Sequence, residues 1–330
     1  MKALVLERPG KPDTLRTVEV PQPEPGNGEV RVKVHAVGLN PVDYKLAASG
    51  FPGWQYPFIL GFDVAGVIDA VGPDVTEWEV GDPVYYSGDL ARGGGYGQYA
   101  IAGANTLSWM PEGLSYAQAA ALPCAGFTAY QAVHRKLRVQ SGKTILIHGG
   151  AGGVGGFAVQ LARAAGLQVF ATCSRHNFNF VTDLGAREVI DYKLENVGEK
   201  VKSLTKNRGV DYIIDTVGSD NATASLDMLA FGGEIVCVAG LPNLASIEAF
   251  SKAISVHEIA LGGAYLSGDQ TAQDDLAKIG REFGAMVSKG TLKPMLEEVI
   301  KLEEIPEALV RLSMRHVRGK IVAQVAGAGS

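Results

Sequence analysis

Three closely spaced glycines, Gly150, Gly152 and Gly155, form the segment best suited to bind a ligand through the backbone. They fit the pattern G-x-G-x-x-G, and they lie between an apolar, β-branched run (144–148) and a helical pattern that begins at Val154. In a strand-to-helix turn without β-carbons, a pyrophosphate can approach the N–H groups at the positive end of the helix dipole. We therefore predict a dinucleotide site, with a plain tight turn as the alternative. The expected contacts are Gly150, Gly152, Gly153, Val154 and Gly155.

The end of the next predicted strand (167–172) indicates which nicotinamide cofactor fits. NAD sites carry an acidic residue there, which binds the ribose 2′-hydroxyl. This chain has Ser174 and Arg175 instead, and a hydroxyl beside a guanidinium suits a 2′-phosphate. We predict NADP(H) as the cofactor. The alternative for Arg175 is a solvated charge at the start of a helix.

Composition excludes several classes of protein. The chain has 330 residues and a formal net charge of −5, without a long basic run, so we expect no nucleic-acid partner. Its three cysteines are too few for a disulfide framework or a four-cysteine zinc site. No apolar stretch reaches the roughly 20 residues that span a membrane. Met1–Glu7 does not read as a signal peptide. We expect a cytoplasmic protein that does not bind membranes.

The order of the predicted elements indicates an α/β fold. The first third contains short strands between Gly and Pro residues, most clearly where Val30, Val32 and Val34 alternate with polar residues. From about Ser115, strands alternate with helices, which predicts a doubly wound parallel sheet. The predicted strands are 144–148, 167–172, 187–190, 210–214, 235–238, 259–265 and 320–325, and the main predicted helices are 154–165, 176–184 and 271–288. No fold is predicted for Ala326–Ser330.

Several segments resemble, in the right order, the medium-chain dehydrogenase/reductase superfamily, specifically its zinc-independent quinone oxidoreductase-like branch. They are 38–43 (GLNPVD), 61–66 (GFDVAG), 80–84 (VGDPV), 121–130 (ALPCAGFTAY), the glycine turn and 318–322 (RGKIV). The resemblance implies a GroES-like β-barrel catalytic domain (1–118 and 267–330) and a Rossmann NADP(H)-binding domain (119–266). It also implies a homodimer or homotetramer.

The residues at the zinc positions of related alcohol dehydrogenases do not suit a metal. The resemblance places the Cys, His and Cys ligands of those enzymes at Asn40, Phe62 and Cys124. One thiolate cannot supply the three protein ligands of a catalytic zinc. The region that corresponds to their four-cysteine loop, near 88–103, contains no cysteine. We expect no metal, and we expect Cys124 to be a small packing residue near the nicotinamide.

Among substrates that accept a hydride, conjugated acceptors need the least charge stabilisation from an enzyme without a metal. When hydride adds to a conjugated position, charge spreads to a remote oxygen, so positioning and one or two hydrogen bonds suffice. We predict a reductase of quinones or α,β-unsaturated carbonyls. The alternatives are an enoyl-thioester reductase, a zinc-free alcohol dehydrogenase-like protein, and a crystallin-like NADPH-binding protein with little turnover.

The resemblance implies that the segment 40–45 lies near the nicotinamide. We expect Asn40 to orient cofactor or substrate, Asp43 to orient its neighbours, and Tyr44 or Lys45 to donate a proton. An equally open alternative is that Asn40 and Asp43 only cap a turn. The aromatic residues Phe51, Trp54 and Tyr56 either line a substrate pocket or pack in the barrel core.

Further cofactor contacts follow from the same resemblance. Thr128 is expected at the start of the helix after Cys124, and the others at the carboxyl ends of strands, where ligands bind. They are Tyr192, Val217, Ala239, Gly240 and Ala264, with Arg318 or Lys320 as candidates for the phosphates.

Overall fold

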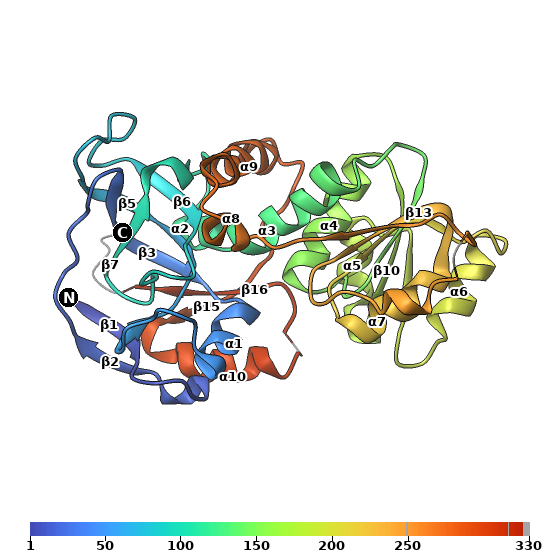
Figure 1. The fold of residues 1–330 in the computed structure, drawn as a ribbon, viewed down its shortest axis with the longest axis horizontal. Helices are drawn as coiled ribbons and strands as arrows, with labels where there is room; N and C mark the ends of the chain where they lie inside the picture. The colour runs from blue at the N-terminus through green and yellow to red at the C-terminus, as the bar shows by residue number, and fades with distance from the viewer. Residues whose placement is uncertain (249, 316, 326–330) are drawn as a thin grey trace. The chain divides into compact units, whose positions relative to one another are not determined.

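The computed structural model describes residues 1–248, 250–315 and 317–325, which form two compact units (Figure 1). The first unit contains Met1–Phe127 and Leu261–Ser330, and the second contains Thr128–Ala260. The sequence predicts boundaries after residues 118 and 266, whereas the units divide after Phe127 and Ala260. The first boundary differs because α3 (Pro123–Tyr130) begins in one unit and ends in the other. Residues 326–330 lie outside the described residues.

The first unit is the GroES-like domain, built on a seven-stranded sheet in the order β15-β16-β3-β5-β6-β8, with β7 also paired to β3. The predicted alternation in β3 is confirmed, because Val30, Val32 and Val34 are buried in the core. A second sheet has the order β2-β1-β4. The strands are β1 (Lys2–Leu6), β2 (Arg16–Glu19), β3 (Glu29–Gly38), β4 (Phe58–Ile59), β5 (Asp63–Val71), β6 (Pro83–Ser87), β7 (Tyr99–Gly103), β8 (Ser108–Trp109), β15 (Leu296–Lys301) and β16 (Lys320–Gln324).

The helices of the first unit pack against these sheets and against one another. They are α1 (Pro41–Ser49), α2 (Tyr116–Ala120), α8 (Gly263–Leu266), α9 (Gln270–Ser288) and α10 (Ile305–Ser313). The strand β16 joins the C-terminal part of the chain to the N-terminal part, because Val322 pairs with Gly38 of β3 in antiparallel register. Figure 1 shows β16 beside β3 and near α1.

The second unit is a Rossmann domain with a six-stranded parallel sheet in the order β11-β10-β9-β12-β13-β14. The strand order reverses between β9 and β12, and ligands of such sheets bind at the carboxyl ends near this reversal. Its elements are β9 (Thr144–Ile147), β10 (Gln168–Cys173), β11 (Glu188–Asp191), β12 (Val210–Asp215), β13 (Leu229–Cys237), β14 (Ser255–Glu258), α4 (Gly153–Ala164), α5 (Phe178–Leu184), α6 (Val197–Leu204) and α7 (Ser219–Ser225).

One predicted strand is wrong. The sequence predicts a sixth strand over 259–265, but the sixth strand is Ser255–Glu258 and residues 263–266 form α8. The reason is that β14 lies at the edge of the sheet and carries His257 and Glu258, so it lacks the apolar run of a buried strand. Among the described residues, no helix combines the length and apolar character needed to cross a membrane.

Candidate active and cofactor sites

The glycine turn lies between β9 and α4, as predicted. A β-carbon on Gly155 would stand 2.2 Å from the carbonyl oxygen of Gly149, so this glycine lets the helix pack closely against the turn. A β-carbon on Gly152 would meet only the Gly149 carbonyl oxygen, at 3.4 Å, which is an ordinary van der Waals contact. The first N–H groups of a helix have no partner within the helix. A helix start without β-carbons lets the pyrophosphate of a dinucleotide approach these groups.

A buried histidine fixes the start of this turn. The Gly149 N–H donates to the Thr172 hydroxyl (3.2 Å), which contacts Nδ1 of His148 (3.3 Å). On the other side of the ring, Nε2 lies 3.0 Å from the Ser225 hydroxyl, whose own hydrogen goes to the carbonyl of Asn221. These directions assign the neutral tautomer with hydrogen on Nε2. Burial lowers the pKa of His148 to about 4, which keeps the ring neutral.

The predicted 2′-phosphate residues gather beyond the ends of β10 and β11. The Ser174 hydroxyl donates to the Tyr192 hydroxyl at 3.3 Å, so two predicted contacts meet. The guanidinium of Arg175 lies 5.2 Å from the ring centre of Phe178, and the ammonium of Lys193 lies 6.0 Å from that of Tyr192. The Ser174 and Tyr192 hydroxyls and the Lys193 ammonium therefore lie together, and Arg175 follows Ser174 in the chain; hydroxyls and cations of this kind suit a phosphate group.

The other predicted cofactor residues divide into those at strand ends and those elsewhere. Val217 follows β12, and its N–H donates to Asp215 Oδ1 at 2.9 Å; Ala239 and Gly240 follow β13. Thr128 lies inside α3 rather than at its start and is buried, because the helix begins at Pro123. Ala264 lies in α8 of the first unit and not at the end of a strand, because the sixth strand ends before it.

The candidate catalytic residues stand at the start of α1. The Asn40 N–H donates to Asp43 Oδ2 at 2.7 Å, and the Asp43 N–H donates to the Asn40 carbonyl at 3.1 Å. The capping alternative therefore describes what these two residues do locally. Tyr44 is half-buried and packs against the core, whereas Lys45 is exposed.

Asn40, Asp43, Asp63 and Lys320 form a buried group, which we call the polar cluster; each is at most 4% exposed. Nδ2 of Asn40 donates to Asp63 Oδ2 at 2.8 Å. The Lys320 ammonium donates to Asn40 Oδ1, to the Leu39 carbonyl at 2.9 Å and to Asp63 Oδ2 at 3.2 Å. Lys320 is therefore not the phosphate contact that the sequence suggested, and the other candidate, Arg318, is paired with Glu297.

Burial dominates the acid–base properties of the cluster. It raises the pKa of Asp43 to about 7, against the lowering effect of the Asn40 N–H. Burial also raises the pKa of Asp63, which the Lys320 ammonium and the N–H donors of Asn40 and Cys124 oppose. Because more donors and a full positive charge face Asp63, the negative charge of the cluster resides on Asp63.

The aromatic residues Phe51, Trp54 and Tyr56 lie in contact through Trp54, which packs in the core. Trp54 is buried in the core, stacks on Phe58 at 3.8 Å between ring centres, and donates from Nε1 to the Leu90 carbonyl at 2.7 Å. Phe51 and Tyr56 contact the same indole ring. The alternative of core packing therefore holds for Trp54.

The residues at the zinc positions do not fit the metal. Asn40 offers an amide already bonded on both sides, Phe62 is a buried hydrocarbon ring, and burial raises the pKa of the Cys124 thiol to about 12. The Lys320 ammonium beside Asp63 would also repel a second cation. In the part of the chain that the structure describes, no three His, Cys, Asp or Glu side chains are grouped to hold a metal ion.

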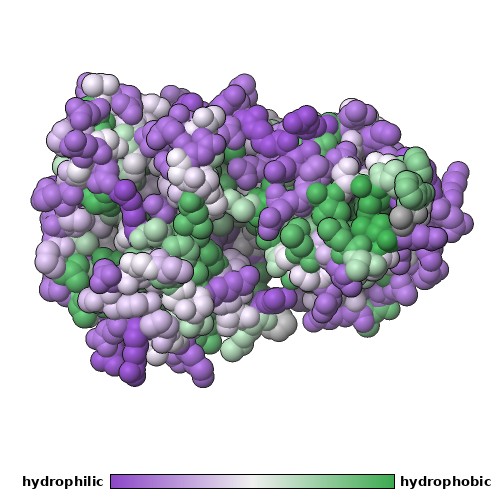
Figure 2. All heavy atoms as spheres, in the orientation of Figure 1, coloured by the Kyte–Doolittle hydropathy of each residue, from purple (hydrophilic) through white to green (hydrophobic). Residues whose placement is uncertain are grey.

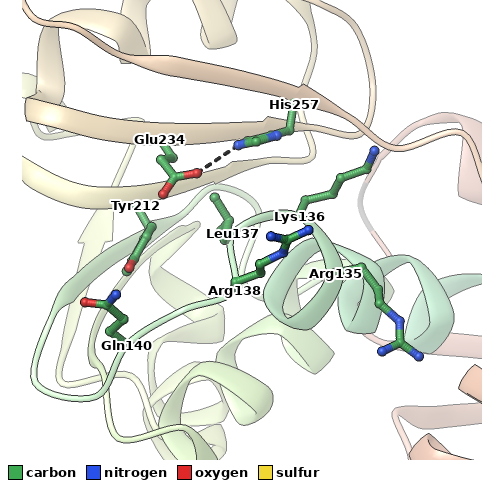
Figure 3. Close-up of a pocket in the computed structure, with 8 residues that line it drawn as sticks. All are labelled: Arg135, Lys136, Leu137, Arg138, Gln140, Tyr212, Glu234 and His257. Carbon is green, nitrogen blue, oxygen red and sulfur yellow. Dashed lines mark hydrogen bonds and ion pairs between the residues drawn. The ribbon is translucent and has the colours of Figure 1, made fainter.

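The second unit also has a hollow of about 540 Å³ away from the glycine turn (Figure 3). His257 and Glu234 pair at 2.9 Å on one side of it, and Arg135 points away from that pair. Tyr212 and Glu234 are register partners within β12 and β13 rather than at their carboxyl ends. None of the predicted site residues lines this hollow; the lining residues are Arg135, Lys136, Leu137, Arg138, Gln140, Tyr212, Glu234 and His257.

Sequence reasoning missed three residues that shape these sites, Asp63, His148 and Lys193, and gave Lys320 a different role. Asp63 and Lys320 meet although they are far apart in the chain, so no local pattern joins them. His148 stood at the end of a predicted strand, but its partners come from β10 and α7. Lys193 could have been found, because it directly follows Tyr192 and adds a cation beside that ring.

Comparison with known proteins agrees with this geometry. Residues 26–158 match the family model "Alcohol dehydrogenase GroES-like domain", and residues 153–291 match "Zinc-binding dehydrogenase". Human quinone oxidoreductase is 32% identical over 93% of this chain and 92% of its own length. The solved quinone oxidoreductase from Coxiella burnetii has a TM-score of 0.83 at 33% identity, covering 98% of this chain and 99% of that one. A solved NAD-dependent alcohol dehydrogenase has a TM-score of 0.87 at 29% identity, covering 99% and 100%.

The fold and the glycine turn at the strand reversal are those of a nicotinamide-dependent oxidoreductase. Together with the similarity over nearly the whole chain, they show that the chain belongs to the medium-chain dehydrogenase/reductase superfamily, in its quinone oxidoreductase-like branch.

Proposed function

We propose that the chain is an NADPH-dependent, zinc-independent reductase of quinones or α,β-unsaturated carbonyls. The observation that carries this proposal is the polar cluster. Asn40 stands at a position where related enzymes have a metal ligand, and its side-chain oxygen instead accepts a hydrogen bond from Lys320. The similarity to quinone oxidoreductases supports the same class of substrate.

NADPH is proposed over NADH because of the group at the ends of β10 and β11. Ser174, Tyr192, Arg175 and Lys193 bring hydroxyls and cations together there. The acidic residue that follows in the neighbouring strand, Asp191, is buried, and Oδ1 accepts the Lys193 N–H at 3.0 Å. Its burial and this bond argue against a contact between Asp191 and a ribose hydroxyl.

The chain's own residues would supply binding, orientation and a proton. The chemistry that a bound reduced nicotinamide supplies is hydride donation. Tyr44 and Lys45 remain the two candidates to protonate the developing enolate or hydroquinone. Asp43 holds the start of α1 through the Asn40 N–H, so its proposed role is to position the helix rather than to reach substrate.

A screen of NADPH oxidation tests this function. The acceptors are a quinone, an enone, an enal and an enoyl thioester, with oxidation of a simple alcohol as the reverse assay. Turnover of the quinone or enone supports the proposal. Turnover confined to the thioester favours the enoyl reductase, turnover confined to the alcohol favours an alcohol dehydrogenase, and cofactor binding without turnover favours the crystallin-like alternative.

The predicted homodimer or homotetramer and the cytoplasmic location stay predictions. The oligomer is supported by apolar side chains that gather on the second unit, at the right of Figure 2. Large exposed hydrophobic residues of this unit include Phe231, Leu241, Leu244 and Phe250, and exposed patches of this kind often mark interfaces. Light scattering on the purified protein tests this directly: the mass of one chain would contradict it.

A further inference from the structure

We propose that Lys320 is the resident cation of the polar cluster, held in a cradle of three oxygens, and that it is the positioning residue for the starts of α1 and α3. The link to turnover rests on the proposed function, whereas the cradle stands on geometry alone. The proposal explains how the chain keeps this place ordered with residues that do not fit zinc.

The cradle uses all three hydrogens of the ammonium group. Lys320 Nζ donates to the Leu39 carbonyl, to Asn40 Oδ1 and to Asp63 Oδ2. A backbone carbonyl, an amide oxygen and a carboxylate are the kinds of oxygen that hold hard cations in proteins. Since a lysine ammonium has three donors and no acceptor, its hydrogen-bonding capacity is filled.

Charge fixes the orientation of the Asn40 amide between its two partners. The amide oxygen faces the ammonium of Lys320, and the amide nitrogen faces the carboxylate of Asp63. Rotating the amide by half a turn would place its N–H groups against the cation and its oxygen against the anion. Both contacts would then be repulsive inside a low-dielectric interior, so one orientation is strongly favoured.

The same ion pair reaches two helix starts. Leu39 and Asn40 lead directly into α1, and the other carboxylate oxygen of Asp63 accepts the Cys124 N–H at 2.9 Å in the first turn of α3. Lys320 itself opens β16. Three segments that are distant in sequence are therefore tied to one buried cation, and loss of that cation leaves Asp63 as an uncompensated buried charge.

The test is removal and chemical restoration of the cation. Lys320→Ala deletes three carbons and the ammonium, which together have the size of n-propylammonium. We expect the variant to melt roughly 10 °C lower and to lose roughly a hundredfold in kcat with a conjugated acceptor. Added n-propylammonium should raise both values in a saturable way, whereas n-propanol, which has the same size and no charge, should not.

Lys320→Met is the matched control, because its side chain fills the space and leaves no room for the added amine. Its defects should persist in n-propylammonium. The cradle is overturned if the amine leaves the Lys320→Ala variant unchanged, if n-propanol restores it equally, or if Lys320→Met is restored as well. If the amine restored the melting temperature of Lys320→Ala but not its kcat, Lys320 would have a purely structural role and the positioning role would be overturned.

A measurement on the unaltered protein covers the case in which Lys320→Ala does not fold. In protein labelled with ¹⁵N-lysine, a buried and fully hydrogen-bonded ammonium exchanges slowly and gives a resolved Nζ signal at neutral pH. We expect Lys320→Arg to remove this signal. If the wild-type protein gives no such signal, the proposal is overturned. Neither the melting measurement nor the NMR measurement requires turnover. If the wild-type protein were inactive with every acceptor, the proposed function would be overturned but the cradle would not.

Discussion

Asp43 and Asp63 are both fully buried in the polar cluster, but only Asp63 contacts the ammonium group of Lys320. Asp63 accepts N–H groups on both oxygens, whereas Oδ1 of Asp43 and the Tyr96 hydroxyl have no partner in good hydrogen-bond geometry among the described residues. The two orphan groups interact electrostatically. Burial and the negative charge of Asp63 favour a proton on Asp43 over the opposing effects of the Asn40 N–H, the Lys320 ammonium and the Tyr96 hydroxyl, and they raise the pKa of Asp43 to about 7.

This difference predicts how stability depends on pH. Folded Asp43 keeps its proton up to about pH 7, whereas the unfolded chain releases it near the ordinary value of 3.8. Between these values the unfolded state binds fewer protons, so the contribution of Asp43 to the free energy of unfolding falls as pH rises. Asp43→Asn keeps an oxygen acceptor for the Asn40 N–H and does not titrate. Its stability relative to wild type should improve by a few kcal/mol from pH 4 to pH 8.

Urea unfolding of both proteins across that range measures the effect. Asp63→Asn serves as the comparison, because it leaves the Lys320 ammonium without its carboxylate and should destabilise the protein throughout. A constant difference between Asp43→Asn and wild type at all pH values would mean that Asp43 titrates normally.

Cofactor choice should depend on the cation beyond β10. We expect NADPH to bind at least about tenfold more tightly than NADH, because a charge-assisted hydrogen bond is worth about 1.5–3 kcal/mol. Arg175→Ala should remove most of this preference by weakening NADPH and leaving NADH unchanged. Fluorescence titration gives both dissociation constants. Arg187→Ala removes an exposed arginine that bonds Gln168 instead and should have no effect; equal affinities in wild type would defeat the assignment.

Two glycine variants should separate binding from folding. A β-carbon at Gly152 meets one backbone oxygen at ordinary contact distance, so Gly152→Val should preserve the fold while blocking the pyrophosphate. Gly155→Val has no room, since its β-carbon would overlap the Gly149 carbonyl, and should lower the melting temperature strongly. Circular dichroism and NADPH titration measure the two effects. Normal NADPH affinity in a folded Gly152→Val protein would show that the cofactor lies elsewhere.

The proton donor should be revealed by paired variants in α1. Replacing the true donor, by Tyr44→Phe or Lys45→Met, should lower kcat by about 10²–10⁴-fold, and the other variant should remain near wild type. Ser49→Ala, at the exposed end of the same helix, is the control for general effects on α1. Steady-state rates with a quinone and an enone provide the measurement. Full activity in both variants would exclude a side-chain donor from this helix.

Much of the Rossmann unit could be predicted because its signals are local. The strand before the turn, the glycines and the amphipathic helix are contiguous, and the order of strands follows from alternation. The prediction misplaces the edge strand because His257 is half-buried and Glu258 is exposed, so the strand has no apolar run in the sequence. Thr128 was placed at a helix start because the earlier start at Pro123 is not marked by a local cap.

The candidate site could be predicted only in part. The pattern around Asn40 and Asp43 indicated a cap or a catalytic pair, and local geometry shows the cap. What the pattern could not show is that Lys320 and Asp63 complete the group, because β16 pairs with β3 only in the folded chain. A lysine near the C-terminus reads as a solvated charge until its burial is known.

The most direct test of a metal-free reductase combines turnover with metal content on one sample. The protein is dialysed against EDTA, its zinc is measured by mass spectrometry, and NADPH oxidation is followed with a quinone and an enone. We predict zinc well below one atom per chain and rates equal to those of the undialysed protein. Loss of activity on dialysis that stoichiometric zinc restores would contradict the account, because it would show that a metal does the work assigned to the chain's own residues.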